Sequence, residues 1–189
     1  MWGNSAHLAE AARFLRERFP KSITDADSSD PEIEILLCQS NHGEGTYDGI
    51  DWGAERAVEE ASHTHDYMNV QPYSSFFLSQ IDDRIRTVEE SGRKVTRFSI
   101  TGYSLGGLVA RYIVGILHHR RFFDTVTPVN FSTIATPHIG LLKFRTLWSK
   151  ISNGLGPTLL GRTGSQFYAK DHYADTGRPL VEIMADKGE

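Results

Sequence analysis

The residue pattern most able to do chemistry is Gly102-Tyr103-Ser104-Leu105-Gly106, a G-x-S-x-G sequence. A serine at this spacing is typical of a nucleophile elbow, the sharp strand-to-helix turn that exposes a serine hydroxyl to a substrate carbonyl. Such a turn strains the serine backbone and leaves little room for side chains two residues away, a demand that Gly102 and Gly106 meet. We expect Ser104 to be a nucleophile. We expect the Leu105 amide to donate a hydrogen bond to the developing oxyanion, aided by the helix N-terminus.

The elements on either side of this pattern decide its meaning, because a bare G-x-S-x-G also occurs in ordinary turns. Residues 95–101 before it are largely apolar and β-branched, which predicts a strand. After it, apolar residues recur at helical spacing and predict a helix with a broad buried face: Leu108, Val109, Tyr112, Ile113, Ile116 and Leu117. Strand, turn and helix therefore follow one another in the order that a nucleophile elbow requires.

Composition narrows the class of protein. The 189 residues, 39% hydrophobic and 23% charged, suit one globular domain. A formal net charge of −4 gives no electrostatic footprint for nucleic acid, so we expect no nucleic-acid partner. The single cysteine, Cys38, allows no disulfide framework or thiolate metal cluster and fits a reducing compartment. No stretch approaches the roughly 20 apolar residues of a membrane span. We expect a cytoplasmic protein without a cofactor.

The rest of the chain alternates between helical and strand patterns. This alternation predicts an α/β fold with a mostly parallel sheet and right-handed crossovers. We expect helices at residues 4–19, 53–60 and 77–88, the last closed by Gly92, and further strands at residues 32–38 and 128–134. The segment 61–75 has no apolar period and is expected to be a loop.

Several polar residues outside the pattern have ordinary structural explanations. Asp48 and Asp51 follow the expected strand 32–38 in a glycine-containing loop, where ligands are handled in α/β sheets. Aspartates at such positions more often cap turns or helices than contact a substrate. His63 and His65 have a spacing that suits a metal, but no third ligand is spaced with them, so we expect no metal site.

The chain also resembles the lipase-like serine esterase family of the α/β-hydrolase superfamily. The resemblance rests on Trp2-Gly3-Asn4 and on residues 46–56, 102–112, 130–140, 163–171 and 175–186. It implies an α/β-hydrolase-like, mostly parallel sheet flanked by helices, and hydrolysis of a lipid carboxylic ester with Ser104 as the nucleophile. It also implies a lipid or other ester substrate, and association with a membrane, lipid droplet or other lipid surface.

Two features depart from the family pattern. The family places a strand and a His-Gly turn, the source of a second oxyanion donor, before the Trp2-Gly3 block, so we expect residues 1–189 to be one domain that is incomplete at both ends. Residues 61–75 look like an inserted loop. A strand placed before that turn would lie between the expected strands 32–38 and 95–101. We therefore expect these two either to pair directly, which would shift the helices over them, or to remain apart with a polar gap that water or another chain fills.

Residues 141–160 combine apolar and aromatic residues with interleaved lysine and arginine. Two interpretations remain open for this segment. It is either a lid or interfacial helix whose aromatic face meets lipid, or a helix packed on the sheet.

The catalytic base and acid are harder to find. In α/β-hydrolases the order along the chain is serine, acid, histidine, so the base must follow Ser104. His118 and His119 fall about 20 Å along the expected helix and are excluded by distance. His138 follows the expected strand 128–134 and is a candidate base, while His172 lies in a polar segment without a preceding strand. We expect the true acid and base to lie beyond residue 189.

Two functions therefore remain open. The first is a serine esterase or lipase that forms an acyl-enzyme on Ser104. The second is a catalytically incomplete α/β-hydrolase fragment that acts as a lipid-binding or interaction module. Labelling of Ser104 by a fluorophosphonate probe would distinguish them. Acyl-chain and headgroup specificity have no sequence signature.

Overall fold

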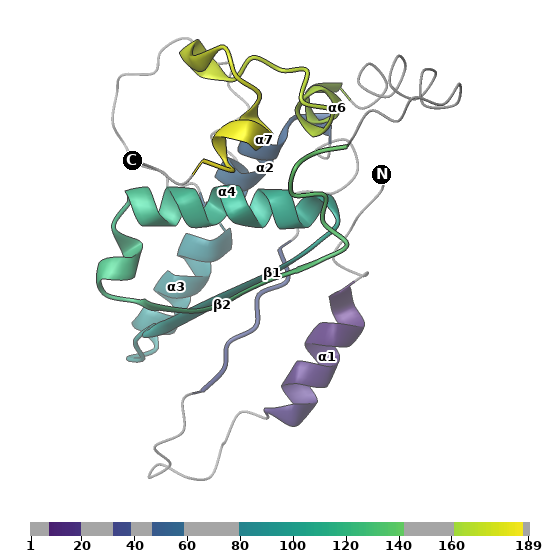
Figure 1. Ribbon diagram of the computed structural model, residues 1–189. Helices are drawn as coiled ribbons and strands as arrows, with labels where there is room; N and C mark the ends of the chain where they lie inside the picture. The colour runs from purple at the N-terminus through teal and green to yellow at the C-terminus, as the bar shows by residue number, and fades with distance from the viewer. Residues whose placement is uncertain (1–7, 20–31, 39–46, 59–79, 142–160, 187–189) are drawn as a thin grey trace.

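The chain folds as a mixed α/β structure built around one long helix, α4 (Leu105–His119). The computed structural model describes residues 8–19, 32–38, 47–58, 80–141 and 161–186. Two parallel strands lie on one side of α4, and the short helices α2 (Ile50–Val58), α6 (Gly161–Phe167) and α7 (Leu180–Ile183) lie on the other (Figure 1).

The sheet in the described residues consists of β1 (Arg97–Tyr103) and β2 (Thr127–Ile134). The strands pair in parallel, from Arg97 opposite Thr127 to Tyr103 opposite Ile134, with one irregularity between Phe98 and Ser99. Helix α4 and the short η4 (Phe122–Asp124) connect them. The strands expected before and after helix α4 are therefore confirmed as β1 and β2, and so is their parallel pairing. Because the carboxyl ends of parallel strands share one edge, both strands deliver their following loops beside Ser104.

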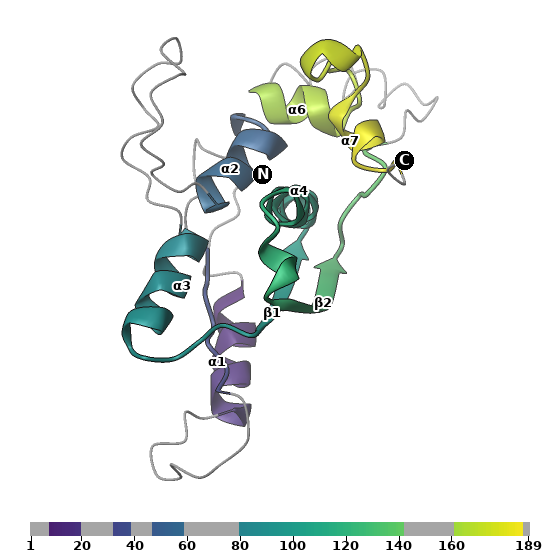
Figure 2. The same ribbon diagram turned by 90° about the vertical axis from the view of Figure 1, so that its left-hand side faces the viewer.

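Helix α4 joins two hydrophobic clusters, so it is buried on both sides. One cluster lies toward β1, η4 and the helix α3 (Gln80–Glu90), and the other lies toward α6 and α7 (Figure 2). The buried members of the first are Ala54, Ile81, Ile113 and Leu117; those of the second are Ile50, Leu108, Phe167, Leu180 and Val181. The helix that follows Ser104 is thus fixed by packing along its length.

The remaining expected helices are present with shifted ends. Helix α1 (Ala9–Arg18) lies within the expected 4–19, but Leu15 and Phe19 are exposed and Ala12 is its buried residue. Helix α2 begins at Ile50 rather than 53. Helix α3 ends before Gly92, whose φ of +79° is the left-handed conformation expected of a helix-ending glycine.

The expected strand at residues 32–38 is wrong. This segment runs extended past α3, but it forms no ladder with β1 or β2 (Figures 1 and 2). An apolar run becomes a strand only where a neighbouring backbone offers matching N–H and C=O groups. Among the described residues, segment 32–38 and β1 therefore do not pair directly, which excludes the first of the two arrangements expected from the sequence.

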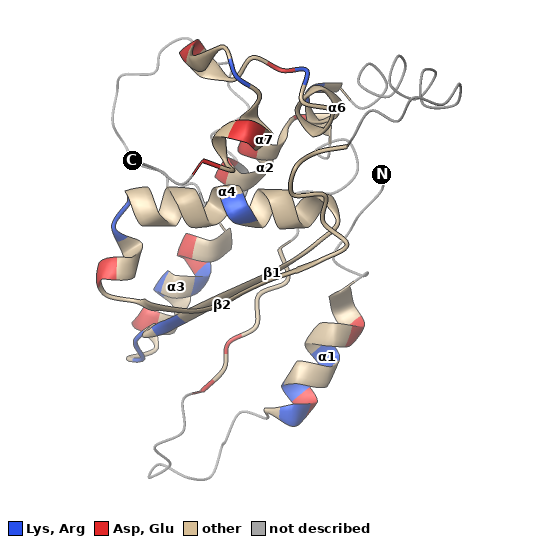
Figure 3. Cartoon of the chain, in the orientation of Figure 1, with Lys and Arg blue, Asp and Glu red and all other residues tan. Residues whose placement is uncertain are grey.

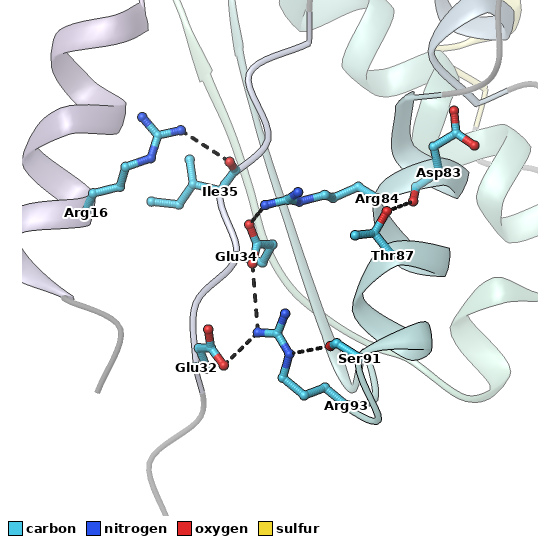
Figure 4. Close-up of polar contacts among 9 residues, drawn as sticks. All are labelled: Arg16, Glu32, Glu34, Ile35, Asp83, Arg84, Thr87, Ser91 and Arg93. Carbon is cyan, nitrogen blue, oxygen red and sulfur yellow. Dashed lines mark hydrogen bonds and ion pairs between the residues drawn. The ribbon is translucent and has the colours of Figure 1, made fainter. Parts of the chain in front are cut away.

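Side chains hold segment 32–38 instead (Figure 4). Arg93 pairs with Glu32 at 2.6 Å, and Arg84 of α3 pairs with Glu34. Arg16 of α1 donates to the Ile35 carbonyl at 3.4 Å. The apolar side chains do not become core, since Ile33 and Leu36 are 41% and 40% exposed.

Three expectations lie outside the described residues: the inserted loop 61–75 with His63 and His65, the lid or packed helix at 141–160 except Leu141, and the block at Trp2-Gly3. In the described ranges, no helix combines the length and the apolar character needed to cross a membrane.

Candidate active site

Ser104 lies at the junction of β1 and α4 in a strained backbone conformation. Its φ is +52° and its ψ is −124°, a left-handed region that non-glycine residues rarely adopt. Such a conformation costs on the order of 1–3 kcal/mol and persists only where the surroundings impose it. Here the surroundings are two glycines and the end of β2.

Position 102 has no room for a side chain and therefore requires glycine. A Cβ atom on it would lie 2.4 Å from the Gly106 carbonyl oxygen and 2.5 Å from the Gly107 Cα atom. Backbone cannot yield to such a contact as a flexible side chain can, so the approach of β1 to α4 depends on this residue having no side chain.

The second crowded glycine is Gly107, not Gly106. A Cβ atom on Gly106 would meet nothing within 4 Å, which corrects the expectation that this position must lack a side chain. A Cβ atom on Gly107 would lie 2.0 Å from the Thr136 hydroxyl. The pattern G-x-S-x-G therefore misses one of the two positions where the turn needs glycine.

Residues at the end of β2 and just after it form hydrogen bonds with both the N–H and the carbonyl of Ser104. The Ser104 N–H donates to the Ile134 carbonyl at 2.8 Å. The Ser104 carbonyl accepts from the Thr136 hydroxyl at 2.8 Å and from the Gly107 N–H at 3.0 Å. Both Ser104 backbone groups are thus paired, and two of the three partners are Ile134, the last residue of β2, and Thr136, two residues beyond it.

Leu105 is the first residue of α4. The first N–H groups of an α-helix have no acceptor within the helix, and the helix dipole favours negative charge at this end. The Leu105 amide therefore occupies a position suited to an anionic oxygen.

His138 is engaged at both ring nitrogens. Its Nδ1 lies 3.3 Å from Arg111 Nη1, and its Nε2 lies 2.8 Å from the Thr133 hydroxyl. Because a guanidinium can only donate, Nδ1 is the acceptor, and the neutral ring carries its hydrogen on Nε2 and donates it to Thr133. These two hydrogen bonds therefore hold the His138 ring in place in the loop after β2.

Arg111 fastens that loop to the rest of the protein. It is the only Lys, Arg, Asp or Glu in α4 (Figure 3). Its guanidinium donates to the carbonyls of His138 at 2.8 Å and Met184 at 2.5 Å, so it joins the loop after β2 to the end of α7. Burial lowers the pKa of Arg111 from its ordinary value. No sequence pattern singled out this residue.

The neighbouring Tyr112 makes a second connection from α4 to the C-terminal part. Its hydroxyl lies 2.5 Å from that of Tyr173, and the two rings meet nearly edge to face at a centroid separation of 6.4 Å. Burial raises the pKa of Tyr112 well above its ordinary value, and the hydrogen bond with Tyr173 raises it further. Tyr112 therefore stays protonated at neutral pH and has a structural place in the fold.

Asp51 is also structural in this fold. It lies in the first turn of α2, and the residue as a whole is 2% exposed. It pairs with Arg162 and accepts from the Gln166 amide at 2.8 Å. Gln166 in turn accepts from the Ile50 N–H at 2.6 Å, so α6 caps the start of α2. Asp48 lies just before this helix.

Comparison with known proteins fits this geometry. Residues 1–189 match the model of the family described as "Putative serine esterase (DUF676)". The chain belongs to this family. One relative, "Putative lipase C4A8.10" of Schizosaccharomyces pombe, is 33% identical over 97 residues, 49% of this chain and 12% of that protein. Another, "Putative lipase ROG1" of Saccharomyces cerevisiae, is 30% identical over 99 residues, 51% of this chain and 14% of that protein. No solved structure is a significant match.

Three further histidines of this serine esterase family member lie in the described residues. His118 and His119 are exposed in the last turn of α4, at the opposite end from Ser104. His172 is exposed in the segment after α6. Within the described ranges no three His, Cys, Asp or Glu residues gather as a metal-ligand group.

One apolar cavity of about 250 Å³ lies away from Ser104. It is lined by Phe98, Ile100, Val114, Phe123 and residues 128–131. The lining residues from β1 and β2 lie away from the carboxyl ends of the strands, and Val114 and Phe123 belong to α4 and η4, whereas Ser104 follows the last residue of β1. This cavity is therefore not a substrate pocket for the candidate nucleophile.

Proposed function

We propose that this member of the serine esterase family carries the nucleophile portion of an α/β-hydrolase-like lipase or esterase. In this proposal Ser104 attacks the carbonyl carbon of a lipid carboxylic ester, and the Leu105 N–H stabilises the oxyanion. The alcohol leaves with a proton, and water then hydrolyses the acyl-enzyme to release the acid.

The observation that carries the proposal is the Ser104 conformation. A positive φ on a serine between a parallel strand and a helix is a costly feature. It places the side chain at the carboxyl edge of the sheet, where α/β folds bind ligands.

Apolar side chains near Ser104 support a lipid substrate. Tyr103 and Ile134, which are paired across the strand ends beside Ser104, are 48% and 51% exposed. Ile139, five residues farther on, is 69% exposed. An apolar acyl chain or a lipid surface would gain by covering them.

The base and acid are proposed to lie outside the described residues. His138 would have to give up its hydrogen bond with Thr133 or Arg111 to take a proton from Ser104. The matched stretches cover 12% and 14% of the two relatives, so most of each relative lies outside the region shared with this chain.

Active-site labelling tests the proposal. A fluorophosphonate probe should label the purified chain, or a version extended at both ends, and mass spectrometry should locate the adduct on Ser104. Ser104→Ala should abolish labelling. Ser132→Ala is the matched control, because Ser132 lies in the adjacent strand at a comparable burial and should leave labelling unchanged. Failure of both forms to label at Ser104 would contradict the proposal.

A lipid-binding or interaction module on the same fold is the second candidate function. The engaged ring of His138 favours it, because the described part then offers Ser104 no hydrogen-bonded base. Vesicle flotation without fluorophosphonate labelling would support this module. Robust turnover of a short-chain ester, abolished by Ser104→Ala and by His138→Gln, would instead make His138 the base.

A further inference from the structure

We propose that Thr136 is a positioning residue that aims the Leu105 amide at the substrate oxyanion. This inference rests on the proposed esterase function, and it adds a residue that no catalytic pattern in the sequence points to.

The argument begins with one peptide plane. The Ser104 carbonyl and the Leu105 N–H belong to the same planar, trans peptide group, so they point in opposite directions. Any contact that fixes the carbonyl therefore also fixes the amide. The Thr136 hydroxyl makes such a contact at 2.8 Å.

The hydroxyl has one hydrogen to give, and the geometry indicates where it goes. The Ser104 carbonyl lies at 2.8 Å, while the alternative acceptor, the Ile134 carbonyl, lies at 3.5 Å. In a hydrogen bond from a hydroxyl to an oxygen, the two oxygen atoms are normally about 2.5–3.0 Å apart. Thr136 therefore donates to Ser104.

Thr136 reaches Ser104 because the chain is shaped for it on both sides. Ala135 has a φ of +52°, a value that residues with a side chain rarely adopt, and this turn brings Thr136 back toward Ser104 just after the Ile134 carbonyl has accepted from the Ser104 N–H. On the other side, the missing side chain of Gly107 leaves the space that the hydroxyl occupies. Two unusual backbone features thus converge on one hydrogen bond.

The contact also opposes the strain at Ser104. Rotation of the Ser104–Leu105 peptide would relieve the ψ of −124° and turn the Leu105 amide away from its outward direction. Without Thr136, the Gly107 N–H at 3.0 Å would be the one donor left to this carbonyl among the residues that the structure describes. Catalysis by an oxyanion donor depends on its being aimed in advance, so a loosened peptide would slow the reaction of Ser104 more than it would weaken ligand binding.

Thr136→Val and Thr136→Ser test this inference in the full chain. Valine keeps the side-chain shape and removes the hydroxyl, whereas serine keeps the hydroxyl. With a fluorophosphonate probe, we expect valine to lower the maximal inactivation rate at least about 10-fold with little change in the half-saturating probe concentration, a smaller effect than the roughly 10²–10³-fold loss for deleting an oxyanion donor. Serine should stay within about 3-fold of the parent.

A second readout separates this inference from the proposed function. The carbonyl carbon of Ser104 should resonate upfield in Thr136→Val, because a hydrogen bond deshields a carbonyl carbon, and should be unchanged in Thr136→Ser. If neither the parent chain nor its version extended at both ends labels at Ser104, the proposed function fails while this shift still tests the contact. The inference is overturned if valine labels at the parent rate, if serine falls as far as valine, or if the Ser104 resonance does not move.

Discussion

The turn at Ser104 and the segment 32–38 are held in place by different kinds of interaction. At the turn, backbone groups meet at 2.8–3.0 Å and two glycines leave no spare room. Along the segment, arginine side chains from elements that do not pair with it as a strand reach across to its carboxylates and to one of its backbone carbonyls (Figure 4). The first arrangement tolerates little displacement, and the second tolerates much.

The difference between these two kinds of interaction shows which parts of the fold are held in precise positions. Steric exclusion and short backbone hydrogen bonds have fixed geometry, and water does not screen them. Partly exposed ion pairs are worth about 0–1 kcal/mol and weaken with salt. The candidate catalytic centre is built from the first kind, as a centre that must hold strain requires.

The largest effect should come from filling the space at position 102. Gly102→Ala places a methyl group 2.4 Å from a backbone oxygen, so β1 and α4 must separate. We expect a loss of unfolding free energy of at least about 3 kcal/mol, measured by urea denaturation, together with the loss of probe labelling at Ser104.

Gly106→Ala is the matched control for that experiment. It adds the same methyl group in the first turn of α4, where nothing lies within 4 Å. We expect stability to be unchanged or raised by up to about 1 kcal/mol, because alanine favours a helix over glycine. Equal losses in the two variants would show that the steric account of Gly102 is wrong.

The ion pair between the buried carboxylate of Asp51 and Arg162 should contribute less to stability than the space at Gly102 and more than the ion pairs of segment 32–38. Asp51→Ala would leave the buried Gln166 amide without its acceptor and Arg162 without its carboxylate. We expect a loss of about 2–3 kcal/mol in urea denaturation. Glu32→Ala removes an exposed carboxylate paired with Arg93 and should cost no more than about 1 kcal/mol.

The outcome of that comparison depends on burial. The Asp51 side chain is 3% exposed and that of Glu32 is 37%. If the two variants lost equal stability, burial would not be what separates these ion pairs, and the contrast between the two regions would fail.

The sequence predicted the β1–α4–β2 unit well, because its signals are local. Glycines, β-branched residues and helical spacing all lie within about forty residues. Local signals could not settle the rest. The start of α2 at Ile50 depends on caps from Thr163 and Gln166, more than a hundred residues away. Segment 32–38 has strand-like composition, but whether it becomes a strand depends on a neighbouring backbone.

The candidate site was predicted only in part for the same reason. The pattern located Ser104 and Gly102, but the crowding at Gly107 and the hydroxyl of Thr136 emerge only when β2 ends beside α4. The glycine directly after G-x-S-x-G was a usable signal for close approach. Arg111 carried no signal, since two of its three acceptors are main-chain carbonyls.

The smallest effect should come from loosening segment 32–38. Arg93→Ala removes the 2.6 Å pair with Glu32 and the longer 3.9 Å contact with Glu34. Cys38 is the only cysteine of the chain and is exposed, so a fluorophore can be attached there without further substitution. We expect lower fluorescence anisotropy at Cys38 in Arg93→Ala. The same change should appear in the parent chain at 1 M salt, where the Debye length is about 3 Å, and the unfolding free energy should change by less than about 1 kcal/mol.

Arg86→Ala is the matched control, because Arg86 pairs with Asp83 and Glu90 inside α3 and makes no described contact with the segment. If Arg86→Ala lowered the anisotropy as much as Arg93→Ala, or if salt had no effect, charge would not be what holds this segment, and packing of Ile33 and Leu36 would have to be examined instead.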